Sequence, residues 1–541
     1  MAAIITNKLR IFNAQKFIES LSEQTPLWQS DGTYTEGDIV LYNSEIFVAV
    51  EDVTGASGFP TESSSNWSKI GTSIYNNLYL GIGKSSPWTD DSNPPTPADA
   101  VSDHYTVKND LLAIKKVGSD AITLALPRIN WTSGTVYSMY DDRNPEEIIP
   151  NGYVLTEDAN KYNVYKCINN SKYTDTTSGV SEVASTVKPS GTGTSLITTG
   201  DGYVWKYMYS IELQEALDFL TKDYIPVKFI TEDPNTGDPG NSLQLQWAVQ
   251  TTNTQGKIQF IKVDKDSADS SRSGGDGYLQ NINQSGVTIP NSTTVAIQLD
   301  SAPSDITTGA YNDYSLVVGS EISRIVSYSY TPSTSTMNLT LENPLTPSSD
   351  SSIIVAPSVQ VTGDGTGCLA YAVTTGSHIS RIEIVNGGSD YTTATATVLP
   401  IPSSGTECKI HAVLSPGSGH GYNPVEELGG YYVMTAVKLN YGEPDTRTTG
   451  DVDFTETVFP VAPADNPVFR QIVIVADPID TSTSRIATNS TYRGPSHPRY
   501  ADGNNKFDIN AGTGKILYVE NRQPVSRAVD QIEDIKVVFE F

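Results

Sequence analysis

The stretch Gly200-Asp-Gly-Tyr-Val-Trp-Lys-Tyr-Met-Tyr209 decides the expected fold. Its first three residues are typical of a turn, and an aromatic residue follows at every second position from Tyr203. Because side chains alternate between the two faces of a strand, these aromatic rings share one face. We expect Tyr203 and Trp205 to belong to the core. The stretch therefore predicts a long, partly buried strand.

The composition extends this expectation to the whole chain. With 541 residues, the chain is too long for one ordinary core, and two to four domains are expected. Only 37% of the residues are hydrophobic, and the abundant Ser, Thr, Gly, Asn and Tyr favour strands and turns over helices. Short helices are predicted at residues 7–21, 103–117 and 212–220. Strands are predicted at residues 75–82, 162–168, 369–373, 379–385, 469–475 and 535–541.

The net charge, the first residues and the cysteines argue against several classes of protein. A net charge of −27 leaves no basic stripe for nucleic acid and no attraction to an anionic membrane. The first residues do not have the pattern of a signal peptide, and no apolar run approaches the length of a membrane span. Cys167, Cys368 and Cys408 are too few and too far apart for a disulfide framework. We expect a protein that is made and assembled in the cytoplasm.

No motif for catalysis, a cofactor or a metal is found. Gly512-Thr-Gly-Lys515 resembles a phosphate-binding loop, but Ile509 and Ile516 stand where that loop needs glycine and a hydroxyl. The five histidines show no H-E-x-x-H or H-x-H pairing. The acidic run from Asp264 lacks the spacing of a calcium loop. The sequence therefore predicts no catalytic residues, no cofactor and no metal site.

Five stretches together resemble one known family, and they occur in the order of that family. These are Leu80-Gly-Ile-Gly83 with Pro87-Trp88, Pro127-Arg-Ile-Asn-Trp131, Gly200-Asp-Gly-Tyr-Val-Trp205, Phe469-Arg-Gln-Ile-Val-Ile-Val-Ala-Asp-Pro478, and Tyr518 to Glu533. They resemble the baseplate wedge subunit, of the gene-product-eight type, of contractile-tailed phages related to the T-even group. The resemblance implies a non-enzymatic structural protein of the virion tail baseplate.

The family resemblance also implies an architecture and partners. It implies a mainly β, multi-domain β-sandwich protein that pairs as a homodimer and joins other wedge proteins around the tail hub. The wedge then rearranges when the tail contracts. The resemblance covers residues 1–23 and 73–235 as the first part of the wedge-subunit core, and residues 425–541 as the second part. Two inserted β modules are expected between these parts.

The first insertion, residues 24–72, is similar to chitin-binding carbohydrate modules. Trp28, Tyr34 and Trp67 are its candidates for stacking on a host surface glycan. In a module this small, however, most aromatics form the core, and we favour that interpretation. The second insertion, residues 236–424, is rich in glycine. Within it Gly274-Gly-Asp-Gly-Tyr278 recurs as Gly387-Gly-Ser-Asp-Tyr391, which predicts short strands joined by tight turns.

The candidate interaction residues follow from their local sequence. Trp88 and Trp131 each lie close to a proline in an expected loop, and exposed aromatics often anchor interfaces. Arg522, Asp530 and Glu533 are predicted to hold the C-terminal strand in register, with a solvated hairpin face as the alternative. Two other functions stay open. A receptor-binding adhesin needs the aromatic module to be exposed, and a polysaccharide-digesting enzyme needs two carboxylates in one cleft.

Overall fold

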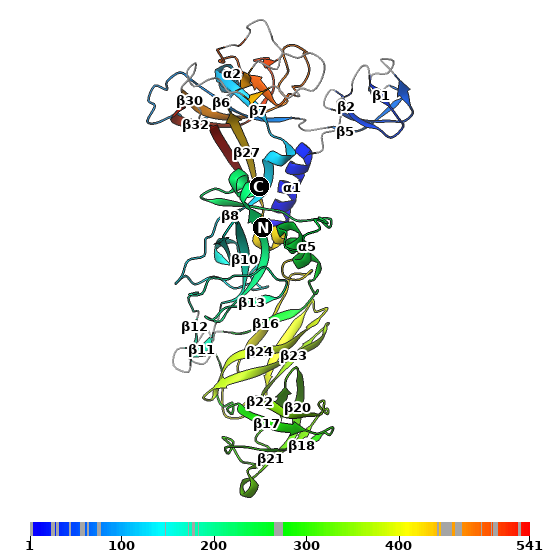
Figure 1. Cartoon of the computed structure of the whole chain (residues 1–541), viewed down its shortest axis with the longest axis vertical. Coiled ribbons are helices and arrows are strands. Elements are labelled where there is room, and N and C mark those ends of the chain that lie inside the picture. Colours follow the sequence, from blue (N-terminus) through cyan, green and yellow to red (C-terminus); the bar gives the residue numbers. More distant parts are fainter. Residues whose placement is uncertain are drawn as a thin grey trace. The chain divides into compact units, whose positions relative to one another are not determined.

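The structure is a computed structural model of the chain. It describes residues 4–22, 28, 32–42, 45–54, 60–61, 64–72, 77–145, 148–170, 173–175, 179–181, 183–264, 274–440, 443–444, 457–459, 468–487, 489–498, 500, 507–528 and 532–541. Most elements are strands, which confirms the mainly β fold class with a few short helices (Figure 1). None of the helices in these ranges is long and apolar enough to cross a membrane.

The chain divides into two compact units. Unit 1 comprises Met1–Leu126, Leu217–Val227 and Tyr431–Phe541, and unit 2 comprises Pro127–Ala216 and Lys228–Gly430. Each unit is therefore built from segments that are far apart in the sequence. The four sequence segments expected as domains stay a prediction.

A five-stranded antiparallel sheet forms the first core of unit 1. Its order is β31 (Thr491–Arg493), β7 (Leu111–Lys116), β6 (Leu78–Gly83), β30 (Val468–Ala476) and β32 (Lys515–Ser526). The predicted strands at 75–82 and 469–475 are confirmed. At Gly81 a β-carbon would lie 2.5 Å from the carbonyl oxygen of Ala113, so only glycine lets β6 and β7 approach so closely.

The helix predicted for residues 103–117 is wrong in its second half. Helix α2 covers Val101–Asp110, and the chain then continues directly as strand β7. Residues 111–114 are all fully buried, because β7 lies inside the sheet with both faces covered. Such a short apolar run fits a buried strand as well as a helix, so its periodicity does not decide between them.

A second sheet of unit 1 contains the C-terminal strand. Its order is β15 (Tyr224–Val227), β8 (Ile122–Pro127), β27 (Tyr432–Asn440) and β33 (Ile532–Glu540). Strand β33 pairs with β27 along its whole length, with Glu533 opposite Leu439 and Phe539 opposite Val433. The strand predicted at 535–541 is confirmed, and its pairing fixes the end of the chain within the fold.

The described residues between 28 and 72 form a small β module, and residues 24–27 of the expected insertion lie outside the described residues. Strands β2 (Ile39–Tyr42), β3 (Glu45–Ala49) and β5 (Trp67–Thr72) make one sheet, and β1 (Thr33–Tyr34) pairs with β4 (Val53–Thr54). The three-stranded sheet agrees with the β character expected for this segment. Its core is a single cluster of apolar side chains.

The aromatic strand of the opening motif lies in unit 2. Strand β14 (Tyr203–Glu212) is in a sheet of order β13 (Leu196–Thr198), β14, β10 (Lys161–Asn170) and β9 (Tyr153–Asp158). Tyr203 and Trp205 are fully buried and stack at 5.4 Å between ring centroids. The strand predicted at residues 162–168 is confirmed as β10, and the strand predicted from Tyr203 is confirmed as β14. The helix predicted at residues 212–220 is confirmed as α4 (Leu213–Phe219).

Helix α5 (Ser242–Thr251) was not predicted from the sequence. It begins within the segment expected to be entirely β, and the Asn241 side chain caps it by accepting a hydrogen bond from the Leu243 amide. Its Val249 packs into the aromatic cluster around Trp205. The helix thus covers the sheet that contains β14.

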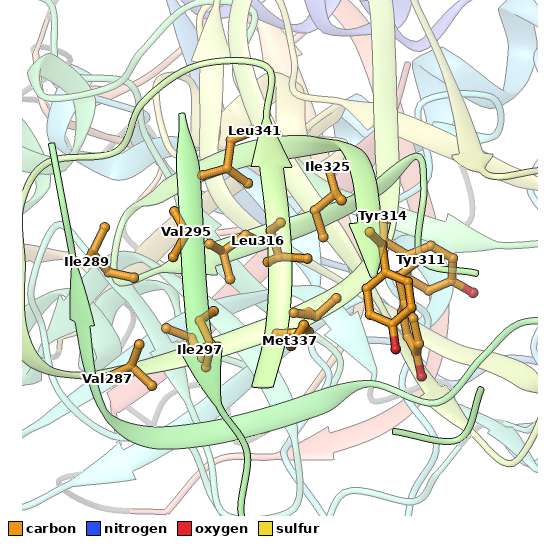
Figure 2. Close-up of a cluster of buried hydrophobic side chains, with 14 of the residues drawn as sticks. Val287, Ile289, Val295, Ile297, Tyr311, Tyr314, Leu316, Ile325, Met337 and Leu341 are labelled. Atoms are coloured by element: carbon orange, nitrogen blue, oxygen red, sulfur yellow. The ribbon is translucent and has the colours of Figure 1, made fainter. Parts of the chain in front are cut away.

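The rest of unit 2 is dominated by a nine-stranded sheet (Figure 1). Its strands are β17 (Ile282–Ile289), β18 (Thr294–Gln298), β19 (Tyr314–Val318), β20 (Glu321–Thr331), β21 (Thr336–Leu341), β22 (Ser348–Gly363), β23 (Thr366–Thr375), β24 (His378–Ser389) and β25 (Ala394–Leu399). Figure 2 shows one core of this region, to which alternate residues such as Val295 and Ile297 contribute. This period of two is typical of half-buried strands. The strands predicted at 369–373 and 379–385 are confirmed.

The internal repeat has a structural basis in two similar turns. The Tyr278 hydroxyl accepts a hydrogen bond from the Cys408 amide at 3.0 Å, and the Tyr391 hydroxyl accepts one from the Cys368 amide at 3.4 Å. Gly275 and Gly388, at matching places in the two copies, have φ angles of +65° and +64°. Each copy therefore closes a glycine turn over a cysteine-containing segment, and both tyrosines belong to one core.

The remaining α-helices and strands include the longest helix of the described residues, which has 16 residues. They are α1 (Asn7–Ser22), α3 (Ile148–Asn151), β11 (Tyr173–Asp175), β12 (Gly179–Ser181), β16 (Ile258–Val263), β26 (Ile410–Leu414), α6 (Pro424–Leu428), β28 (Glu443–Pro444) and β29 (Thr457–Phe459). Strand β16 pairs with β26, which brings together the beginning and the end of the glycine-rich segment.

Candidate interaction surfaces and buried charge clusters

Trp88 lies half-buried in the loop after β6. Its indole nitrogen donates a hydrogen bond to the Arg522 carbonyl oxygen at 3.0 Å, and the Lys84 ammonium lies 5.1 Å from the ring centroid. The side chain therefore joins two distant segments of unit 1 and leaves only part of its surface for a partner. A role for Trp88 in an interface stays a prediction.

Arg470 is a structural residue next to this loop whose role the sequence did not indicate. Its guanidinium makes two hydrogen bonds to the Asp91 carboxylate, at 2.8 and 2.7 Å, and a third to the Ser85 carbonyl at 2.6 Å. The hydrogen bond from Arg470 lowers the pKa of Asp91. Arg470 is the one charged residue of β30, whose other residues are apolar except for Gln471, and such a lone charge indicates a buried partner.

Trp131 contacts its own unit in a similar way. Its indole nitrogen donates to the Ser185 hydroxyl at 3.1 Å, and the ring packs against the aromatic cluster of Tyr203 and Trp205. The side chain is half-buried, so an interface role again stays a prediction. Because it is half-buried, the Trp131 side chain has less surface available to a partner than a fully exposed tryptophan has.

The C-terminal strands β32 and β33 lie in different sheets, and the predicted charged residues of this region have different surroundings. Arg522 is exposed and pairs with Glu520 at 3.3 Å, and Asp530 lies outside the described residues. Glu533 is buried and pairs with Arg527, whose Nε donates to the carboxylate at 2.7 Å. Arg527 and not Arg522 therefore holds Glu533, because the Arg522 side chain faces solvent while Arg527 points into the unit.

The aromatic residues of the 28–72 module favour the core interpretation. Trp28 is 6% exposed and Trp67 is 3% exposed, and both belong to the core cluster of the module. The half-buried Tyr34 packs edge-on against Trp67 at 5.2 Å between centroids. Stacking on a sugar needs an open ring face, so the structure does not support Trp28 and Trp67 as glycan-stacking residues.

Helix α1 has both a packed and an exposed apolar side. Ile11 and Ala14 are buried, and Phe17 packs against Phe539 at 6.1 Å between ring centroids. Leu9 and Phe12, in contrast, are 48% and 52% exposed. The predicted helix is thus confirmed, but its apolar residues divide between the unit's own sheet and an open surface that a partner can cover.

A buried charge cluster lies in unit 2, where β10 meets the start of α6. The Lys166 ammonium donates to Glu427 at 2.7 Å and lies 3.1 Å from His420 Nδ1. It also lies 4.3 Å from the centroid of the Tyr140 ring. The side chains of Lys166 and Glu427 are 0% and 4% exposed. We call Lys166, His420 and Glu427 the lysine cluster.

Burial and charge shift the pKa values in the lysine cluster. Burial alone would raise the pKa of Glu427, but the Lys166 charge and the contact with His420 outweigh it and lower this pKa to about 2. Burial, with help from the Lys166 charge, lowers the pKa of His420 to about 4. The cluster therefore holds a charged Lys166–Glu427 pair beside a neutral imidazole at neutral pH.

Comparison with known proteins shows that parts of this chain are similar to one family. Residues 173–242 and 426–541 match the family described as bacteriophage T4 Gp8. The baseplate wedge protein gp8 of Enterobacteria phage T4 is 26% identical over 212 residues, which cover 33% of this chain and 62% of the T4 protein. The chain is similar to gp8 baseplate wedge proteins. The chain thus spans less than two thirds of the length of this relative.

The two segments that match gp8 correspond to defined parts of the fold. The first contains β14, α4 and β15, and the second contains β27, β30, β32 and β33. They also contain Glu427, Arg470, Arg527 and Glu533. The stretches around Trp88 and Trp131, which the sequence assigned to the same family, lie outside the match. The gp8 resemblance is therefore confirmed over the aromatic strand and the C-terminal sheets.

Proposed function

We propose that this chain is a structural subunit of the baseplate wedge of a contractile phage tail. One observation carries the proposal: the segments that match gp8 include long strands of the four-stranded and five-stranded sheets of unit 1 and the aromatic strand of unit 2. Strands outside the match, such as β6 and β8, pair with these matched strands. A protein whose framework follows gp8 is expected to occupy the same place in a tail, and the net charge of −27 suits a soluble precursor of an assembly.

The proposal includes a homodimer and contacts with other baseplate proteins. Exposed apolar side chains on α1, such as Leu9 and Phe12, are of the kind that subunit contacts cover. In the assembled tail the dimer rearranges with the wedge during contraction. The subunit has no catalytic part in this process, because its contribution is to hold neighbouring proteins in place.

Two measurements test this proposal. Light scattering on the purified full-length chain should give a mass of twice 58.4 kDa. Electron microscopy of tails labelled with an antibody against the chain should place the label at the end of the tail distal to the head. Antibody that was first absorbed with the purified chain is the control. Label along the sheath or on fibres, or no label on intact tails, would refute the wedge assignment, whereas a monomeric mass would refute only the dimer.

The alternative of a glycan-binding adhesin has no specific observation in its favour. It rests on the 28–72 module, and the tryptophans of that module are buried. Label on fibres in the same micrographs would revive it.

A further inference from the structure

A second cluster of ionisable side chains lies in unit 2, apart from the lysine cluster. His411 on β26 is the direct neighbour of Lys262 on β16 in the paired strands. Asp141 and Asp142 approach from the segment before α3, and one ligand atom from each aspartate and from His411 lies within 4.8 Å of the others. Asp264 immediately follows β16. Residues from β26, from the end of β16 and from the segment before α3 thus meet at the His411 imidazole.

The His411 ring is oriented by one carboxylate and faces another. Nδ1 lies 2.6 Å from Asp264 Oδ1, and since a carboxylate only accepts, Nδ1 carries the proton of this hydrogen bond. Nε2 faces Asp141 Oδ1 at 3.7 Å. His411 is 5% exposed, yet no described residue forms a hydrogen bond with its Nε2 or with Asp142 Oδ1. Buried polar atoms normally have a partner, so both atoms point to a ligand between them.

The charges and distances suit a divalent cation. Asp141, Asp142 and Asp264 bring three carboxylates together, and Lys262 neutralises one of them through a 2.9 Å contact to Asp141 Oδ2. Arg143 lies 4.0 Å from Asp264, but its side chain is 60% exposed. Zinc binds imidazole and carboxylate atoms at about 2.0 to 2.2 Å in a tetrahedral arrangement, so its ligand atoms are about 3.4 Å apart. His411 Nε2 and Asp141 Oδ1 lie 3.7 Å apart, and one ligand atom from each of the three residues lies within 4.8 Å of the others, so an inward movement of the side chains would bring them to this separation.

We propose that Asp141, Asp142 and His411 bind a divalent transition-metal ion of the zinc type, with Asp264 as the residue that orients His411. A carboxylate that accepts from the far ring nitrogen is the usual support of a histidine ligand. Imidazole with two carboxylates suits zinc and its neighbours better than calcium or magnesium. The site ties β26 to the segment before α3, so its role is to stabilise unit 2.

The sequence did not predict this site, because its ligands lie far apart in the chain and show no short spacing. His411 has no second histidine near it in sequence, and Asp264 was examined only as part of a calcium loop. The site depends on the pairing of β16 with β26, which is a tertiary feature.

The test uses the tag-free full-length chain, treated with chelator and then dialysed against zinc chloride. We expect one equivalent of zinc per chain by elemental analysis and a rise in the melting temperature on zinc addition. His411→Ala and Asp142→Asn should each abolish the bound equivalent, and Asp264→Asn should weaken zinc binding about 10- to 100-fold. His104→Ala is the matched control, because His104 pairs with Asp99 at 2.9 Å in unit 1 and belongs to no group of three possible metal ligands among the described residues.

The variants also distinguish the metal site from a simple charge cluster. If no metal binds, Asp142→Asn removes a partly buried negative charge beside Asp141, and the melting temperature should rise. If zinc binds, the same change lowers the zinc-loaded melting temperature. Since Asp142→Asn keeps the side-chain shape, it tests the site even if His411→Ala does not fold. Zinc content no higher than in a zinc-free blank, or equal in wild type and Asp142→Asn, would overturn the proposal.

Discussion

Each unit of the molecule buries ion pairs, and one pair of unit 1 is built differently from one pair of unit 2. In unit 1 Arg527 pairs with Glu533, six residues later, through two hydrogen bonds. In unit 2 Lys166 pairs with Glu427, which lies far along the chain, and shares its ammonium with His420. Both acids belong to the segment that matches gp8, whereas Lys166 lies outside it.

The difference teaches how each pair responds to perturbation. A guanidinium stays charged in proteins, and its planar fork fits a carboxylate, so the arginine pair depends on geometry. An ammonium loses its proton when burial is not compensated, and burial lowers the pKa of Lys166 while Glu427 opposes this effect. The lysine cluster therefore depends on protonation as well as on geometry. Because the chain has two units, each cluster should be followed by hydrogen exchange on its own strands.

The largest expected effect is that of Glu427→Gln. The change leaves the Lys166 ammonium buried without its charge partner, and removal of one member of a buried pair costs about 3 to 5 kcal/mol. Hydrogen exchange of β10 amides, together with urea unfolding at pH 7, should show this loss. The loss should be smaller at pH 9, because an uncompensated Lys166 has a lowered pKa and deprotonates more readily there.

Glu426→Gln is the matched control, since Glu426 is the exposed neighbour on the same short helix. It should change stability by less than about 0.5 kcal/mol. Equal effects of the two changes would mean that the Lys166–Glu427 pair contributes nothing beyond a surface charge, and the contrast between the two units would disappear.

The pH dependence of unit 2 should be the second largest effect. Burial, followed by the Lys166 charge, lowers the pKa of His420 from 6.5 to about 4. The unfolded chain then binds more protons than the folded one between these values, so stability is complete above pH 6.5 and is lost as pH falls towards 4. The lowering corresponds to roughly 3 kcal/mol.

His420→Gln should remove this part of the pH dependence, whatever its effect on stability at pH 7. Exchange of β10 amides, measured at several pH values between 7 and 4 and corrected for intrinsic rates, gives the slope. The β33 amides beside the arginine pair provide an internal reference. An unchanged slope in the variant would show that His420 is not the group that titrates.

The sequence predicted those parts of this picture that depend on local patterns. The strands at Tyr203, Phe469 and Ile535 were found because alternation or an apolar run is a property of neighbouring residues. The switch from α2 to β7 at Leu111 was missed, since the buried run fits both structures. Helix α5 was also missed, because the glycine-rich composition around it favoured strands.

The sites were harder to predict because they depend on tertiary contacts. Arg522, Asp530 and Glu533 were predicted to hold the C-terminal strand in register, which stays a prediction, and only the structure shows that Glu533 is paired with Arg527. Trp28 and Trp67 look alike as core or as binding residues in sequence, and only their burial separates the two. The pairing of Lys166 with Glu427 could not be predicted from the sequence, because the two residues lie far apart in the chain.

The smallest expected effect is that of Arg527→Lys, and it sharpens the contrast between geometry and protonation. Lysine keeps the charge opposite Glu533 but cannot make the two parallel hydrogen bonds, so we expect a loss of about 1 to 2 kcal/mol, seen in exchange of β33 amides. Arg522→Lys is the control, because Arg522 pairs with Glu520 in an exposed position where such pairs contribute about 0 to 1 kcal/mol. If geometry matters only in the buried pair, Arg527→Lys destabilises β33 and Arg522→Lys does not. A similar small loss in both variants would mean that charge alone holds the C-terminal strand, and that the two units differ less than their contacts indicate.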